Sequence, residues 1–165
     1  MSILKNLTKL CFLISLLMSC EEVVEPVGEC EVYRWASATR NGEDLCLGTT
    51  VINYWNPNTE NAYIGFTAGS TERVGIPEID ASFGVPVAGI TLNTDYPLLS
   101  GKIAAADELT EGFISFITFD YPSCVAGTFE LIATDTIAGV TQTYKNGKFV
   151  FNFEGTLNSM CNPFN

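Results

Sequence analysis

The chain has 165 residues, a length that accommodates one ordinary domain, and its 47% hydrophobic and 16% charged residues exclude intrinsic disorder. A formal charge of −11 repels phosphate groups, so it disfavours nucleic acid and anionic lipid headgroups as binding partners. The sequence has no histidine, which excludes a Ser-His-Asp or Cys-His mechanism built from this chain alone.

Residues 1–19 have the features of an export signal. Two lysines form a basic start, and residues 10–18 make an apolar run that is too short to span a bilayer. The run ends in Leu17-Met18-Ser19-Cys20, which resembles the lipobox of bacterial lipoproteins. The resemblance implies cleavage before Cys20, diacylglycerol on its sulfur and an acyl chain on its new amine, because several chains make attachment durable. The alternative is an ordinary signal peptide with Cys20 in a disulfide bond.

Residues 20–29 are predicted to form an acidic tether that joins the lipid to a β domain at residues 30–165. Glutamates, Pro26 and Gly28 favour an extended, solvated chain in this segment. Acidic residues directly after the lipidated cysteine resemble the surface-export signal of Bacteroidota lipoproteins. We therefore expect an outer-membrane protein, held through the lipid on Cys20, that faces the cell surface; the periplasmic face is the alternative.

Four cysteines remain for the domain: Cys30, Cys46, Cys124 and Cys161. An even number in an exported chain predicts disulfide bonds rather than free thiols. We favour the pairs Cys30–Cys46 and Cys124–Cys161, because each joins neighbours in the sequence, although two other connectivities stay open. Zinc binding is the competing interpretation, and the sequence has neither a C-x₂-C pair nor a histidine to support it.

The domain has the pattern of a series of β-strands without a long helix. Strands are predicted at residues 32–38, 49–54, 62–67, 90–92, 112–119 and 128–134. Asn41-Gly42 predicts a turn after the first strand. Glycines and prolines divide residues 69–89, which we expect to form a long loop with at most one short strand, and residues 104–109 suggest a single helical turn.

Asn146-Gly147 predicts a hairpin, because this dipeptide is the strongest short hairpin signal. A two-residue turn there would put Val140, Tyr144, Phe149, Phe151 and Phe153 on the buried face. Gln142 would face inward as well, so it requires a polar partner, a position at the rim or a bulge. Successive hairpins predict a single all-β domain, either an antiparallel β-sandwich or a partly open β-barrel.

Three blocks in the C-terminal third carry a family resemblance. They are residues 111–120, Gly127-Thr128-Phe129-Glu130 and Asn146-Gly147-Lys148-Phe149. Their order resembles the strand, GTF and NGKF blocks of small Bacteroidota cell-surface lipoproteins of unknown function. The resemblance implies a β fold and a place in the cell envelope, and it brings no catalytic residues to this chain.

Exposed aromatic side chains are the first candidate binding residues. Trp35, Tyr54 and Trp55 fall on the first two predicted strands or just after them, and Tyr63 falls on the third. Aromatic rings on a surface can stack on sugar rings, whereas the alternative is that these rings pack in the core.

Carboxylates are the second group of candidates. Asp107, Glu108 and Glu111 lie close together in the sequence, with Asp95 and Asp120 as possible neighbours. Oxygen ligands of this kind hold calcium, and a facing pair can hydrolyse a glycosidic bond. The alternative is that they are ordinary solvated charges.

The sequence contains no catalytic, metal or cofactor motif. We therefore expect a non-catalytic module that binds a glycan, a protein or another surface component. A carboxylate-dependent hydrolase that acts on glycans and a purely structural role in the envelope are the alternatives.

Overall fold

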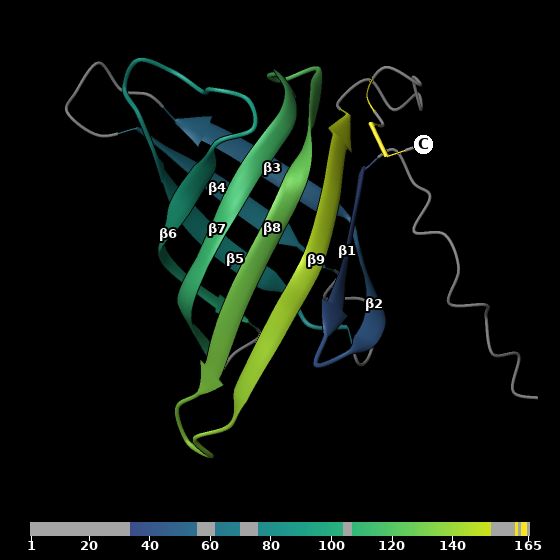
Figure 1. Cartoon of the computed structure of the whole chain (residues 1–165), viewed down its shortest axis with the longest axis vertical. Coiled ribbons are helices and arrows are strands. Elements are labelled where there is room, and N and C mark those ends of the chain that lie inside the picture. Colours follow the sequence, from purple (N-terminus) through teal and green to yellow (C-terminus); the bar gives the residue numbers. More distant parts are fainter. Residues whose placement is uncertain are drawn as a thin grey trace, which may run out of the picture.

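Nine antiparallel strands form one sheet that curls into a nearly closed barrel in the computed structural model (Figure 1). The structure describes residues 34–55, 62–69, 76–103, 107–152, 161, 163 and 164. The strands are β1 (Arg34–Arg40), β2 (Glu43–Gly48), β3 (Thr50–Trp55), β4 (Ala62–Ala68), β5 (Ile79–Val85), β6 (Asp95–Ile103), β7 (Asp107–Asp120), β8 (Cys124–Asp135) and β9 (Thr141–Asn152). The described residues contain no helix, and the predicted all-β fold is confirmed.

The strand order in the sheet is β2-β1-β9-β8-β7-β6-β5-β4-β3. Strands β3 to β9 follow one another up and down, and β1 then pairs with β9 on its free side. In Figure 1, β7, β8 and β9 lie in front of β3, β4 and β5, so the barrel is flattened into two layers. Strand β3, at one edge of the sheet, contacts β9 and β1 without pairing with either, so the sheet curls back on itself.

Aromatic rings fill the interior of the barrel. The fully buried phenylalanines are Phe66, Phe83, Phe116, Phe129 and Phe149, from β4, β5, β7, β8 and β9, and the ring of Tyr144 on β9 is fully buried as well. The Phe66 ring centroid lies 5.2 Å from that of Phe129 and 5.3 Å from that of Phe149. Burying these rings removes a large apolar area from water and so stabilises the fold. The space at this level is therefore occupied by the protein's own side chains.

The hairpin predicted at Asn146-Gly147 is wrong, because β9 runs through both residues as one strand. Phe129 pairs with Gly147 and Leu131 pairs with Tyr144, so two residues of β9 lie opposite one residue of β8. This is a β-bulge, in which Asn146 takes the left-handed backbone conformation with φ of 51°. The extra residue shifts the alternation of side chains along β9 by one position. Tyr144 and Phe149 therefore both point to the inner face.

The structure confirms some of the other sequence predictions and corrects the rest. The Asn41-Gly42 turn is confirmed, since both residues have positive φ and join β1 to β2. The loop predicted over residues 69–89 contains the seven-residue strand β5, and residues 107–109 begin β7 rather than a helical turn. Val140, predicted to be buried, is exposed in the turn between β8 and β9, and Phe153 lies outside the described residues.

A disulfide bond joins Cys124 to Cys161 with a Cα–Cα distance of 5.5 Å, as predicted. Cys46 is also disulfide-bonded, but Cys30, the partner predicted for it, lies outside the described residues. The export signal, Cys20 and the acidic tether lie outside them as well, so those assignments stay predictions.

Candidate functional site

Only one of the three aromatic residues predicted to bind a ligand is well exposed. Trp35 is 8% exposed and packs edge-on against Phe164, with 6.0 Å between the ring centroids. For this residue the alternative, packing in the interior, is therefore the correct one. Tyr54 is half-buried on the inner side of β3, where its ring contacts those of Phe119 and Tyr121. Trp55 is 52% exposed on the outer side of the same strand.

Trp55 has an aromatic neighbour on the next strand. It lies directly opposite Tyr63 in the pairing of β3 with β4, and the two ring centroids are 5.1 Å apart. Residues that alternate along a strand point to opposite faces, and Ile52 and Ile64 of these strands are buried inside the barrel. Trp55 and Tyr63 therefore form one aromatic patch on the outer wall.

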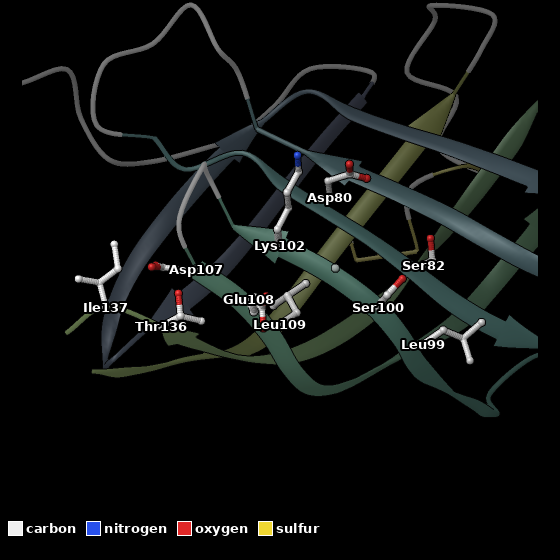
Figure 2. Close-up of a pocket in the computed structure, with 11 residues that line it drawn as sticks. Asp80, Ser82, Leu99, Ser100, Lys102, Asp107, Glu108, Leu109, Thr136 and Ile137 are labelled. Atoms are coloured by element: carbon white, nitrogen blue, oxygen red, sulfur yellow. The ribbon is translucent and has the colours of Figure 1, made fainter. Parts of the chain in front are cut away.

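An open groove lies on the outer side of β5, β6 and β7, where the wall of the barrel is split (Figure 2). Strands β6 and β7 pair at Pro97–Phe113 and again at Lys102–Glu108, but the four residues between these points on each strand form no ladder pairs. The hollow has a volume of about 790 Å³. Its position at an interrupted ladder follows the common placement of binding sites beside bulges.

Local chemistry explains the split. Pro97 has no amide hydrogen to donate to a ladder at the point where pairing stops. Thr110 is an extra residue in the pairing of β7 with β8, and its hydroxyl donates to the carbonyl of Ile132, at 3.3 Å, which draws β7 toward β8. Gly101 lets the strands cross closely, since a Cβ there would lie 2.6 Å from a methyl carbon of Leu109.

The groove combines polar walls with apolar ends. Leu99 and Ile137, which are 62% and 89% exposed, lie at its two ends in Figure 2. The polar side chains that line it are Asp80, Ser82, Ser100, Lys102, Asp107, Glu108 and Thr136. The lining thus offers three carboxylates as hydrogen-bond acceptors, an ammonium group as a donor, and three hydroxyls that serve as either.

One end of the groove is held by a capped turn. The backbone amides of Ile137 and Ala138 donate to Oδ1 of Asp135 at 2.7 and 2.8 Å. These two bonds favour the ionised carboxylate and lower the pKa of Asp135. The turn between β8 and β9 therefore has a defined shape, which places Ile137 beside the groove.

A polar network connects the groove to the barrel interior. The side-chain amide of Gln142 donates to Oδ2 of Asp107 at 3.2 Å, and its oxygen accepts from the hydroxyl of Tyr144 at 3.3 Å. Burial raises the pKa of Tyr144, while the hydrogen bond and the positive charge of Arg40 act in the opposite direction. The inward-facing Gln142 thus has two hydrogen-bond partners, Asp107 and Tyr144. Its bond to Asp107 orients a carboxylate of the groove.

The predicted acidic group is only partly assembled. Asp107 and Glu108 line the groove, whereas Glu111 does not, and Asp95 and Asp120 lie at the far ends of β6 and β7. Within the described ranges, no three Cys, Asp or Glu side chains gather closely enough to hold a metal ion. In that same part of the chain, no helix has the length and apolarity needed to cross a bilayer.

Comparison with known protein families, curated proteins and solved structures gives no match. The sequence does not identify the groove residues of β5 and β6. It predicts at most a short strand in the region of β5 and no strand in the region of β6. An available signal was the alternation of Ile79, Ala81, Phe83 and Val85, all buried, with the polar or small residues between them. Such alternation is typical of a half-buried strand.

Proposed function

We propose that this protein is a lipid-anchored, non-catalytic module that binds a glycan in the groove across β5, β6 and β7. The observation that carries the proposal is the lining of that groove, which brings three carboxylates, three hydroxyls and one ammonium group together between two apolar ends. Few ligand classes match this combination as well as sugars do, because each sugar ring has many hydroxyls at its edge and apolar C–H groups on its faces.

Each part of the lining has a role toward such a ligand. Carboxylates accept hydrogen bonds from sugar hydroxyls, and Lys102 donates to hydroxyl or ring oxygens. Leu99 and Ile137 contact the C–H faces at the two ends. Asp107 is held by Gln142, so it needs little reorganisation when a ligand arrives.

The packed interior supports a ligand on the outer wall. Barrels that enclose a small ligand leave their lumen open, whereas five phenylalanine rings meet in this one. The groove lies outside that aromatic layer and is open to solvent. A large or polymeric glycan can therefore reach it without any opening of the barrel.

The anchor places this module in the envelope. Lipid on Cys20 would hold the domain at the outer membrane, facing the cell surface, and the acidic tether of residues 21–29 would reach about 30 Å when extended. The tether and the acidic domain are repelled by anionic headgroups. The groove would thus stand clear of the bilayer, where it can meet extracellular or cell-wall glycans.

A glycan array probed with the full-length protein in mild detergent tests the binding proposal. We expect binding to one class of polysaccharide, and a loss of about tenfold in affinity for Asp107→Asn and for Lys102→Ala. Glu130→Gln, on the outer side of β8, is the matched control and should bind normally. Absence of binding across the array would contradict the proposal.

Mass spectrometry of the bound glycans separates binding from hydrolysis. Unchanged glycans after long incubation are expected of a non-catalytic module. Shortened products that disappear in Asp107→Asn would instead favour the carboxylate-dependent hydrolase, for which Asp80, Asp107 and Glu108 in the groove are the available groups.

Fractionation of cells tests the anchor separately. Cys20→Ala should move the protein from the membrane to the soluble fraction, and protease added to intact cells should remove the wild-type domain. Membrane association that survives the substitution would contradict lipid attachment at Cys20. Full protection from protease would place the domain in the periplasm.

A further inference from the structure

The groove and the Trp55–Tyr63 patch lie on one continuous outer surface. Strand pairing puts Trp55 opposite Tyr63, and Tyr63 opposite Gly84 on β5. A Cβ built on Gly84 would lie 3.2 Å from a methyl carbon of Leu99, so the Leu99 side chain from β6 covers this glycine. The row therefore runs from the aromatic patch to the apolar end of the groove.

A second row beside the first is polar. Asn53 lies opposite Gly65, Gly65 opposite Ser82, and Ser82 opposite Ser100. Ser82 and Ser100 already line the groove, and Asn53 is exposed on β3. Hydrogen-bonding side chains thus extend from the groove toward the edge of the sheet, along the flank of the apolar row.

Glycine forms the floor between the groove and the patch. Gly65 carries no side chain on the outer face of β4, between Asn53 and Ser82, and the Leu99 side chain lies over Gly84. Tyr63, Trp55 and Leu99 stand above the floor at Gly65. The outer surface is therefore low at Gly65 and is bounded by two aromatic rings and an aliphatic side chain. We name the surface formed by Asn53, Trp55, Tyr63, Gly65, Gly84 and Leu99 the glycine channel.

We infer that the glycine channel extends the groove into a site for an oligosaccharide chain, with one sugar ring stacked on Trp55 and Tyr63 and others held in the groove. This inference rests on the proposed glycan-binding function and adds the length of the ligand to it. Strand β3 is three strand spacings from β6, or about 14 Å, which is longer than one sugar ring. The site therefore selects an extended chain over a monosaccharide.

Titration calorimetry with oligosaccharides of two to six units tests the inference. The probes are length series of α-glucans, β-glucans, mannans, xylans and chitin, offered to the full-length protein. Affinity should rise with length in a series that binds. Trp55→Ala should weaken the longest member by about three- to tenfold and leave the shortest member unchanged, whereas Trp55→Phe should keep most of the gain with length.

Gly65→Val tests the channel floor without removing a contact. A Cβ at Gly65 would lie 3.5 Å from the Cβ of Asn53, an ordinary contact, and valine suits a strand, so the fold should be retained. The variant should lose the gain with length, and a thermal unfolding temperature at or above that of the wild type would show that it is folded. Thr128→Val, on the outer side of β8, is the matched control.

The outcomes separate the two proposals. If no series binds the wild-type protein, the proposed function fails and the channel with it. If a series binds equally well at every length, or if Trp55→Ala and Gly65→Val bind long chains as the wild type does, the groove stands and the channel is wrong. Length-dependent loss in both variants supports the channel.

Discussion

The side-chain amide of Gln142 on β9 donates a hydrogen bond to Oδ2 of Asp107 on β7, at 3.2 Å, and so links a groove carboxylate to the barrel interior. Strand β8 lies between the two, and its Ala133, opposite Gln142, is small enough to let the side chains meet above it. With one oxygen held by Gln142, Asp107 has its other oxygen free to accept a hydrogen bond from a ligand hydroxyl.

Gln142→Leu should weaken both folding and binding. The substitution leaves Asp107 without its donor and the Tyr144 hydroxyl without its acceptor. We expect the unfolding free energy in urea to fall by about 1–2 kcal/mol and glycan affinity to fall by about three- to tenfold. Thr141→Val, at an exposed position on the same strand, controls for general effects. Unchanged glycan affinity in a folded Gln142→Leu protein would show that the hydrogen bond from Gln142 to Asp107 does not contribute to binding.

Tyr144 should make the fold less stable in alkaline solution. Burial raises its pKa in the folded protein above the ordinary value of 10.0, so the folded state holds the proton more tightly than the unfolded state does. This contribution is constant below pH 10 and is lost as the pH rises from 10 through the raised pKa.

Denaturant unfolding between pH 8 and 11 checks this sign. The unfolding free energy of the wild-type protein should fall more steeply above pH 10 than that of Tyr144→Phe. Tyr121→Phe, which removes an exposed tyrosine hydroxyl instead, is the matched control. Equal slopes for the wild type and Tyr144→Phe would contradict a buried neutral tyrosine at this position.

The Cys124–Cys161 bond should hold the C-terminal residues against Trp35. Cys161 and Phe164 pack with Trp35, and Lys148 lies 5.3 Å from the centre of the Phe164 ring. Replacing both cysteines with alanine should lower the unfolding free energy by about 2–4 kcal/mol.

Tryptophan fluorescence reports the same change locally. In a Trp55→Phe background, only Trp35 emits, and the double cysteine substitution should shift its emission to longer wavelength as water reaches the indole. An unchanged emission maximum would show that the C-terminal residues stay in place without the bond.

Glycine at position 147 should be far less replaceable than its neighbour asparagine. A Cβ at Gly147 would lie 2.4 Å from the carbonyl oxygen of Phe129, so Gly147→Ala should lower the unfolding free energy by more than about 2 kcal/mol. Glycine tolerates the positive φ of position 146, so Asn146→Gly should change the unfolding free energy by less than about 1 kcal/mol. A thermal melt of both variants distinguishes the bulge from a simple turn, in which both positions are open to solvent.

This bulge also marks the limit of what the sequence predicts. Tyr144 and Phe149 both face inward although four residues, an even number, lie between them, and either a two-residue hairpin or a one-residue bulge satisfies that pattern. Local propensity favours the hairpin. The choice depends on β1 and β8, which pair with β9 on both sides through the bulge, and such long-range pairing is not encoded in the dipeptide.

The candidate site was harder to predict than the fold. Alternating apolar residues predicted several strands, and the even number of cysteines, paired as neighbours in the sequence, predicted the Cys124–Cys161 bond. The groove instead arises where β6 and β7 separate, and this depends on Pro97, Gly101 and Thr110 acting together across two strands. Trp55 was identified from residue type alone, but only the register shows that it lies on the same face as the groove.

Chemical-shift mapping by NMR, with ¹⁵N-labelled full-length protein and an oligosaccharide that the array identifies, tests the central claim most directly. We predict that the amide shifts change most at Ser82, Ser100 and Lys102 and at neighbouring residues of the groove, with little change at Glu130 on the outer side of β8. Changes confined to β1, β8 and β9, or changes among the buried phenylalanines of the interior without any in the groove, would contradict the claim.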